Sequence, residues 1–166
     1  MYIMKALIKG ISLVSILAVL AYTSSLLSGP TAEPIDVVEH NCLAMNIYHE
    51  ARNEPEEGQI AVAHVTLNRV NHTNWPNTIC DVVYDPMQFS WTHLVLDHTP
   101  RESASWETSK TIARDVMLGN NIDPTHGAVF YHANYVNPTW VTYVTLSRVI
   151  GSHLFYTWDG DWDATN

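Results

Sequence analysis

Apolar and polar residues follow a helical spacing from about Asn41 onward. At about 100° per residue the apolar positions fall on one arc of a helix. They are Leu43, Ala44, Ile47, Tyr48 and Ala51. Glu50 lies at the edge of this arc, so the pattern predicts a carboxylate half against the core and half toward a surface or cleft. Partial burial raises the pKa of a carboxylate, which suits a general acid.

A second helix is predicted over about 56–70, because Pro55 interrupts the first helix and suits the first turn of the next. This segment is apolar almost all round, which is typical of a central buried helix. Its narrow polar stripe consists of Glu57, His64 and Asn68. The pattern leaves open whether this stripe lines a site or faces solvent.

Residues 71–101 are rich in Asn, Pro, Asp and aromatic side chains and contain few periodic runs. We therefore expect a long irregular segment of the kind that often carries function. A third helix is expected over about 104–118, with Ser103 or Ser105 as its N-cap and Gly119 as its stop.

The pattern changes after the third helix and predicts strands. Residues 128–133 (AVFYHA) form one candidate strand, and 141–150 and 153–157 flank the two-residue turn Gly151-Ser152 of a hairpin. The sequence therefore predicts an α+β fold, with a mainly helical body and a small antiparallel sheet near the C-terminus.

The N-terminal segment is apolar and carries an export pattern. Lys5 and Lys9 precede a stretch without charge from Gly10 to Ala32, long enough to cross a bilayer as a helix. It fits a signal peptide or a signal anchor, and either predicts an exported protein, periplasmic or extracellular, or one anchored to the cytoplasmic membrane. The expected segments are a signal peptide or transmembrane helix with the start of a linker (1–32), the linker (33–41), one catalytic domain (42–157) and an acidic tail (158–166).

The net charge of −9 excludes nucleic acid as an expected partner, because its binding depends on clustered Lys and Arg. The same charge argues against adhesion to an anionic surface, whereas the 6 Trp and 8 Tyr residues supply rings that can pack in the core or stack on flat ligand faces such as sugar rings. We expect the protein to be a monomer.

The chain contains two cysteines, Cys42 and Cys80. Behind an export signal, two spaced cysteines favour one disulfide over two buried thiols.

Four segments of the chain resemble, in order, the sequence blocks of the SleB-type cell wall hydrolase family. The resemblance covers about 42–157, and four blocks in the family's order argue against a chance match. The blocks are NIYHEARNEPEEGQIAVAHVTLNRV (46–70), TICDVVYDPMQFSW (78–91), DPTHGAVFYHANYVNPTW (123–140) and RVIGSHLFY (148–156).

The resemblance implies a lysozyme-like, mainly helical fold and cleavage of peptidoglycan glycan strands between N-acetylmuramic acid and N-acetylglucosamine. The family's catalytic glutamate matches Glu50 in YHEARNE. In lytic transglycosylases, which the family resembles, the 6-hydroxyl of the muramoyl sugar attacks its own anomeric carbon, so that one glutamate serves first as acid and then as base. Cleavage by water needs a second carboxylate, for which Glu54, Glu57 and Asp85 are the candidates.

Substrate-binding residues are expected in the second and third blocks, where amide, hydroxyl and aromatic groups suit N-acetyl sugars. The candidates are Gln88, Ser90, Trp91, Tyr131, His132 and Asn134. No cofactor is expected.

Two alternative functions remain at this point. A zinc-dependent amidase would cut the same polymer at its peptide stem, but Asn53 stands where HExxH needs its second histidine, and His126 and His132 lie in different local structure. We therefore expect no metal. A non-enzymatic, membrane-tethered wall-binding protein is the other alternative, and the position of Glu50 at the core edge argues against it.

Overall fold

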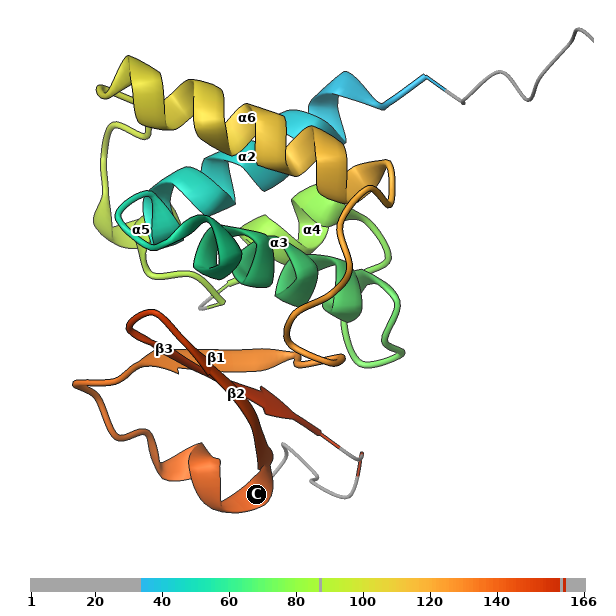
Figure 1. Cartoon of the computed structure of the whole chain (residues 1–166), viewed down its shortest axis with the longest axis vertical. Coiled ribbons are helices and arrows are strands. Elements are labelled where there is room, and N and C mark those ends of the chain that lie inside the picture. The colour runs from blue at the N-terminus through green and yellow to red at the C-terminus, as the bar shows by residue number, and fades with distance from the viewer. Residues whose placement is uncertain (1–33, 87, 159, 161–166) are drawn as a thin grey trace, which may run out of the picture. The chain divides into compact units, whose positions relative to one another are not determined.

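The computed structural model describes residues 34–86, 88–158 and 160. Its helices are α2 (Val37–Ala51), α3 (Glu56–Val70), α4 (Ile79–Tyr84), α5 (Trp91–Leu94) and α6 (Ser103–Met117). They are followed by β1 (Phe130–Ala133), the 3-10 helix η1 (Thr139–Tyr143), β2 (Thr145–Ile150) and β3 (His153–Thr157). In Figure 1 the helices form one layer and the sheet packs against it. The predicted α+β class, with a helical body and a late antiparallel sheet, is confirmed.

Helix α2 begins at Val37, inside the segment expected to be a linker. The Asp36 carboxylate accepts hydrogen bonds from Val38 N at 2.8 Å and Glu39 N at 3.2 Å, so this residue acts as an N-cap. The apolar spacing that predicted the helix starts only where the helix reaches the core, because Val37 and Val38 are exposed.

The segment expected to be irregular contains two short helices that the sequence pattern did not predict, α4 and α5. Thr78 caps α4 by accepting from Asp81 N at 3.1 Å. Glu39 of α2 accepts from Ile79 N at 2.5 Å, so part of the cap comes from another helix. Such a tertiary cap leaves no trace in the local sequence.

The predicted bond between Cys42 and Cys80 is present and joins α2 to α4.

The third helix lies close to its expected position but starts without either predicted serine cap. Its N-cap position is Glu102, which makes no side-chain cap bond. Gly119, with φ 72°, follows the end of the helix, where a left-handed residue is common.

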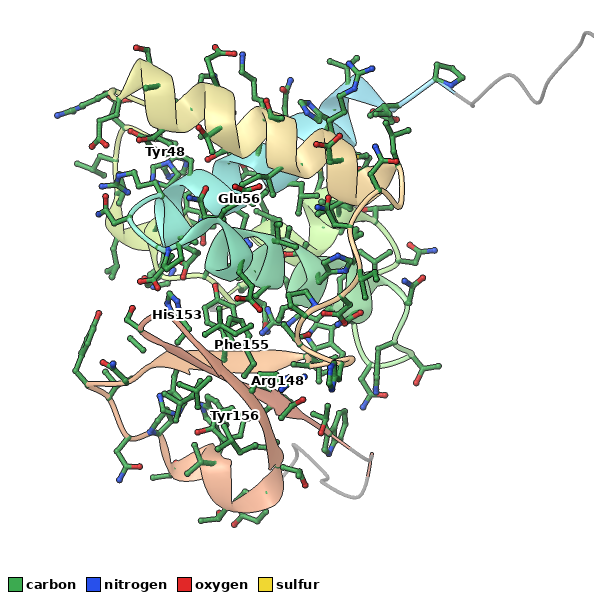
Figure 2. All side chains as sticks on the ribbon, in the orientation of Figure 1. Tyr48, Glu56, Arg148, His153, Phe155 and Tyr156 are labelled. Atoms are coloured by element: carbon green, nitrogen blue, oxygen red, sulfur yellow. A yellow bond between two sulfur atoms is a disulfide. The ribbon has the colours of Figure 1, made fainter. Side chains whose placement is uncertain are left out.

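Two clusters of buried side chains make the core. One lies among the helices and contains Leu43, Ile47, Val83, Phe89, Ile112 and Val116. The other joins α3 to the sheet and contains Val62, Val65, Ala128, Ile150 and Phe155. Phe155 is fully buried and lies between the sheet and the helices in Figure 2. The sheet that carries part of the site therefore rests on the central helix.

The sheet is antiparallel in the order β1-β3-β2. Tyr131 pairs with Phe155, and Ala133 pairs with His153. The hairpin turn at Gly151-Ser152 is confirmed, with Gly151 at φ 58°. Pairing begins at Phe130, later than expected.

The strand expected over 141–150 is wrong in its first part, where η1 takes its place. Pro138 precedes η1, and Trp140 packs against Phe130 at 5.3 Å and Tyr156 at 5.6 Å between ring centroids. This packing favours a turn of helix over an extended strand.

The apolar N-terminal segment lies outside the described residues. Within the described part of the chain, no helix combines the length and the apolar character needed to span a bilayer.

Candidate active site

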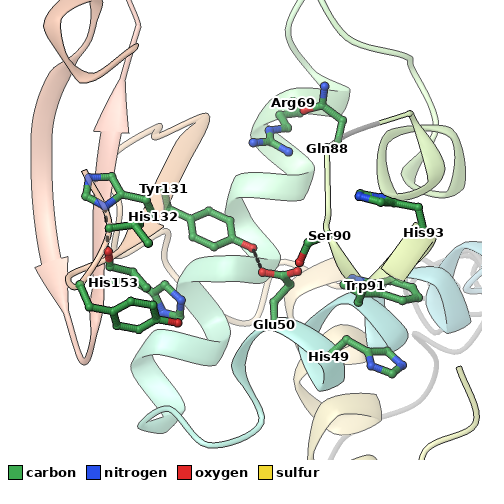
Figure 3. A pocket seen from close by; sticks show the side chains of 13 residues that line it. His49, Glu50, Arg69, Gln88, Ser90, Trp91, His93, Tyr131, His132 and His153 are labelled. Atoms are coloured by element: carbon green, nitrogen blue, oxygen red, sulfur yellow. Dashed lines mark hydrogen bonds between the residues drawn. The ribbon is translucent and has the colours of Figure 1, made fainter. Parts of the chain in front are cut away.

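A cleft of about 570 Å³ opens between the helical body and the sheet (Figure 3). Helix α2 supplies its floor with Glu50, and α3 contributes Arg69. One wall comes from the irregular segment before and within α5, and the other from β1 and the turn after it. The lining residues are His49, Glu50, Arg69, Gln88, Ser90, Trp91, His93, Tyr131, His132, Ala133, Tyr135, Val136 and His153.

Glu50 is half-buried, as its place at the edge of the apolar arc predicted. The Tyr131 hydroxyl donates a hydrogen bond to Glu50 Oε2 at 3.0 Å. Burial raises the pKa of the Glu50 carboxyl, while the Tyr131 hydrogen bond and the charge of Arg69 oppose that rise without cancelling it. A carboxyl with a raised pKa that faces a cleft is suited to donate a proton near neutral pH.

Tyr131 is a fixed hydrogen-bond donor. Burial and the neighbouring charge of Glu50 hold its pKa well above the usual range, so the phenol keeps its proton. Its ring packs edge-on against His153, with centroids 5.2 Å apart. The predicted Tyr131 therefore serves both as cleft wall and as partner of Glu50.

Arg69 places a buried positive charge beneath the cleft. Only 5% of it is exposed, and its Nε donates to Val129 O at 2.8 Å. Its guanidinium lies over the Phe89 ring at 5.2 Å. Burial lowers the pKa of Arg69, and its neighbours Tyr131, Glu50 and Asp85 raise it in return. Because an arginine remains protonated even so, it favours the carboxylate form of Glu50.

Trp91 is the centre of the wall from the irregular segment. It is 4% exposed, its Nε1 donates to Asn46 Oδ1 at 3.1 Å, and its ring stacks on His49 at 4.4 Å. Gln88 and Ser90, beside it, reach the cleft as expected. Burial lowers the pKa of His49, which favours a neutral imidazole against the indole.

The opposite wall holds His132, whose Nε2 lies 2.8 Å from the Tyr156 hydroxyl. Tyr135, which the sequence analysis did not select, also lines this wall and is 84% exposed. The predicted Asn134 is exposed and is not among the lining residues; its backbone N–H donates to Ser152 O at 2.8 Å.

Glu50 is the only carboxylate among the described lining residues. Glu54 is bonded to Ser152 outside the cleft. Glu57 lines a separate hollow of about 400 Å³ beside Asp123 and Arg148. Asp85 lines neither. The three candidates for a second carboxylate are therefore not brought together with Glu50 on the cleft surface.

The polar stripe of the second helix neither lines this cleft nor faces solvent as a whole. His64 is buried, and Asn68 donates to Asp123 Oδ2 at 3.0 Å and to Ala128 O at 2.9 Å. Only Glu57 is exposed. The stripe mainly anchors the loop that leads into β1.

The sequence analysis missed Arg69, His49, His93, Tyr135 and His153 as cleft residues. Arg69 gave a usable signal, since a charged residue on a helix that is otherwise apolar must find buried partners. His49 is the neighbour of Glu50 on α2, whereas His93, Tyr135 and His153 reach the cleft from segments that only the tertiary fold brings together.

The chain has relatives among known proteins. The family model described as Cell Wall Hydrolase matches residues 53–156. Spore cortex-lytic enzymes of Oceanobacillus iheyensis and Bacillus subtilis are 32% and 33% identical over 116 residues. These matches cover 68% of the chain but only 39% and 35% of the relatives. The chain therefore spans well under half the length of these curated relatives.

Two solved structures resemble the whole described region. The catalytic domain of the germination-specific lytic transglycosylase SleB from Bacillus anthracis aligns with a TM-score of 0.62 and 30% identity, covering 76% of this chain and 100% of that domain. The catalytic domain of the Bacillus cereus SleB protein aligns with a TM-score of 0.64 and 29% identity, covering 78% of this chain and 99% of that domain.

Proposed function

The chain belongs to the cell wall hydrolase family, and from this premise we propose that it cleaves the glycan strands of peptidoglycan as a lytic transglycosylase. Glu50 is the catalytic residue in this proposal. The observation that carries it is the cleft that contains a half-buried carboxyl with a raised pKa and no second carboxylate among its described lining residues.

The reaction needs one group that gives and then takes a proton. Glu50 donates its proton to the glycosidic oxygen as the bond from the muramoyl anomeric carbon to that oxygen breaks, which releases a free 4-hydroxyl on N-acetylglucosamine. The muramoyl 6-hydroxyl then bonds to the anomeric carbon, and its proton passes to the Glu50 carboxylate. The product is a 1,6-anhydro ring, and the enzyme ends in its starting protonation state.

Tyr131 and Arg69 support both halves of this cycle. When Glu50 has lost its proton, the hydrogen bond from Tyr131 and the charge of Arg69 stabilise the carboxylate. Burial favours the return of the proton. The carboxylate form and the protonated form of Glu50 are thus each favoured by part of its surroundings, as a group that gives and then takes a proton requires.

The cleft walls are the proposed glycan-binding surface. Gln88, Ser90 and His132 offer polar groups to N-acetyl and hydroxyl substituents, and Trp91 closes the wall beside Glu50. The exposed ring of Tyr135 is available to stack on a sugar face. Substrate binding by Asn134 stays a prediction. Because this residue lies outside the cleft lining, it would contact a part of a long glycan that extends beyond the cleft.

The proposal also includes the site of action. Export by the N-terminal segment places the catalytic domain beyond the cytoplasmic membrane, where peptidoglycan is found, and retention of that segment anchors the protein there. The protein acts as a monomer.

The test is the product formed from purified wall by the protein and by Glu50→Gln. We expect muropeptides with intact stems and 1,6-anhydro ends, one water lighter than reducing ends by mass spectrometry. Because acid catalysis contributes about 10²–10⁴-fold, Glu50→Gln should lose activity by that order while remaining folded.

Glu57→Gln is the matched control, since Glu57 is exposed and lies outside the cleft. It should act like the unaltered protein. Near-normal activity of Glu50→Gln, or release of free stem peptides, would overturn the proposal. Reducing muramic ends would show that water is the nucleophile.

A further inference from the structure

Glu54 makes the tightest polar contact between the helical body and the hairpin. It lies in the turn between α2 and α3, and only 13% of its side chain is exposed. Its carboxylate accepts from Ser152 N at 2.8 Å and from the Ser152 hydroxyl. Its backbone carbonyl accepts from Gln59 Nε2 at 3.1 Å, which fixes the turn that presents it.

The hairpin is shaped to admit this carboxylate. Gly151 has a φ of 58°, and a Cβ placed on it would overlap Glu54 Oε2 and meet Pro55 Cδ at 3.0 Å. A side chain at this position would therefore push the hairpin away from the turn. The close approach depends on glycine both for its backbone angle and for the space it leaves.

The Glu54–Ser152 contact is linked to Glu50 through the sheet. Glu50 and Glu54 are on the same short stretch of chain, one at the end of α2 and one just beyond it. Ser152 leads into β3, where His153 pairs with Ala133 of β1. Tyr131 of β1 returns to Glu50 through its hydroxyl.

The start of β1 is held separately. Arg69 bonds to Val129 O, and Asn68 bonds to Ala128 O, both from α3. Without the Glu54 contact these polar bonds would still fix the sheet to the helices at this end, while the hairpin end would be held mainly by apolar packing such as that of Ile150 and could shift. Tyr131 lies between the two ends, so movement of the hairpin changes the distance from its hydroxyl to Glu50.

We propose that Glu54 is a positioning residue, which holds the hairpin so that the Tyr131 hydroxyl stays on Glu50 Oε2. This inference rests on the proposed function of Glu50. It also gives Glu54 a role other than that of second carboxylate, because its carboxylate is bonded to Ser152 and Glu54 is not among the lining residues of the cleft.

The charged and titratable groups around Glu54 are few. From β3, His153 Nδ1 lies 3.9 Å from Glu54 Oε2. Burial favours the protonated form of Glu54, but the two Ser152 bonds and His153 outweigh it and lower its pKa. Burial lowers the pKa of His153 in turn. Near neutral pH Glu54 is therefore a carboxylate beside a neutral imidazole. In this form it accepts both hydrogen bonds from Ser152.

The test compares Glu54→Gln and Ser152→Ala in the full chain, with Glu57→Gln as the matched control. Both variants weaken the same contact from opposite sides, and the second removes only a hydroxyl. We expect kcat to fall about 10- to 100-fold, as for a small misplacement of a reacting group, with KM nearly unchanged. The double variant should lose little more than either single variant, because the two share one contact.

The pH profile separates positioning from mere structure. Loss of the Tyr131 bond removes an influence that lowers the pKa of Glu50, so the alkaline limb of the kcat profile should move to higher pH in both variants. A pH profile and a kcat like those of Glu57→Gln would overturn the inference. It would also be overturned if the unfolding temperature of the variants showed that loss of folded protein accounts for the whole drop in kcat. Reducing-end products from the unaltered protein that disappear in Glu54→Gln would make Glu54 catalytic and also overturn it. Failure of the proposed function is distinguishable, because it appears as activity in Glu50→Gln.

Discussion

Glu50 has neighbours that change its acidity in opposite directions. Burial raises its pKa, and the Tyr131 hydroxyl and the Arg69 charge lower it. The hydrogen bond at 3.0 Å is the one contribution that a single substitution removes without changing the shape of the cleft.

Tyr131→Phe should therefore raise the pKa of Glu50 further. If protonated Glu50 is the acid, activity falls as pH rises through its pKa, so the alkaline limb of kcat/KM should appear at higher pH in the variant. The measurement is wall lysis by the purified proteins across a pH series. Tyr84→Phe, which alters an exposed tyrosine, should leave the limb in place. A limb that stays or moves to lower pH in Tyr131→Phe contradicts the assigned pairing.

At the residue level the sequence predicted the position of Glu50 better than its surroundings. Helical spacing placed Glu50 at the edge of the core, and the family resemblance gave its role. Arg69 lies near the end of α3, and its hydrogen bond to Val129 O joins residues 60 positions apart in the sequence. The sequence indicates that Arg69 must find buried partners, but no local pattern identifies those partners, so its effect on Glu50 is seen only in the folded chain.

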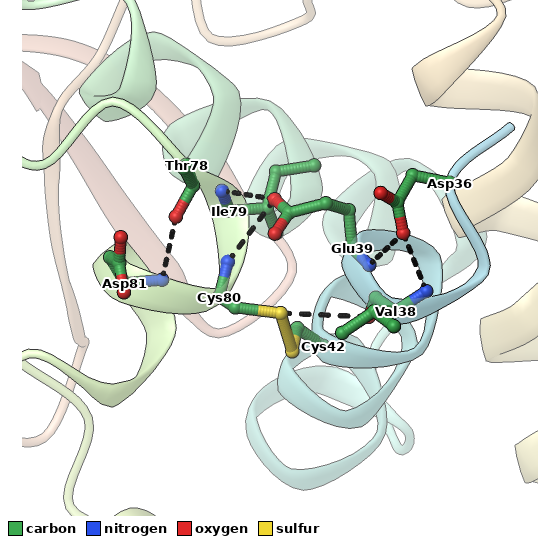
Figure 4. The surroundings of a disulfide bond; sticks show 8 residues. All are labelled: Asp36, Val38, Glu39, Cys42, Thr78, Ile79, Cys80 and Asp81. Atoms are coloured by element: carbon green, nitrogen blue, oxygen red, sulfur yellow. Dashed lines mark hydrogen bonds between the residues drawn. A yellow bond between two sulfur atoms is a disulfide. The ribbon is translucent and has the colours of Figure 1, made fainter.

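Helix α2 is fixed at both ends by different means. Near its start the disulfide joins it to α4, and Glu39 caps α4 beside that bond (Figure 4). At its far end Glu50 and Glu54 contact the sheet region. The disulfide is therefore distant from Glu50 along the helix, and we expect it to affect the stability of the fold.

Reduction of the Cys42–Cys80 bond should lower the free energy of unfolding by about 3–4 kcal/mol, the chain-entropy value for a loop of this length. Denaturant unfolding with and without reductant measures the change. Activity should persist wherever the reduced protein remains folded. The double variant Cys42→Ser/Cys80→Ser serves as control, since reductant should not alter it. An equal reductant effect in both proteins would contradict the assignment of the stability to this bond.

Elements with their own periodic pattern were predicted well, and those made by tertiary contacts were not. Helix α3 was expected over about 56–70 and spans Glu56–Val70. Helix α4 depends on a cap from Glu39, which lies 40 positions away. The 3-10 helix η1 replaced the start of an expected strand because Trp140 packs on rings from β1 and β3. In both cases a distant partner decides a short element.

At the scale of the whole molecule, the proposed site of action depends on residues 1–32. Their uncharged stretch after Lys5 and Lys9 is long enough to enter a bilayer, while the described domain offers no such helix.

The full chain carrying Glu50→Gln, which prevents lysis, should fractionate with membranes or appear outside the cytoplasm in a bacterial host. Without residues 1–32 the same protein should remain in the cytoplasmic fraction, because nothing directs it to the export machinery. Immunoblots of the fractions measure this, and alkaline extraction separates an anchor from a cleaved signal. A cytoplasmic full chain would contradict the export prediction.

The cleft has a floor of packed helix and two walls of largely irregular chain. Glu50 and Arg69 are carried by α2 and α3, whereas Gln88 and Ser90 precede a four-residue helix and Tyr135 follows a four-residue strand. Loops of this kind tolerate change better than the elements that they connect. Exposed wall side chains such as Ser90 and Tyr135 can therefore be exchanged with little effect on the packing beneath them, whereas Phe89 and Trp91 of the same region belong to the core. Under the proposed function, exchange of these exposed side chains between relatives should redirect the protein to differently substituted glycans, while Glu50, Tyr131 and Arg69 keep their contacts.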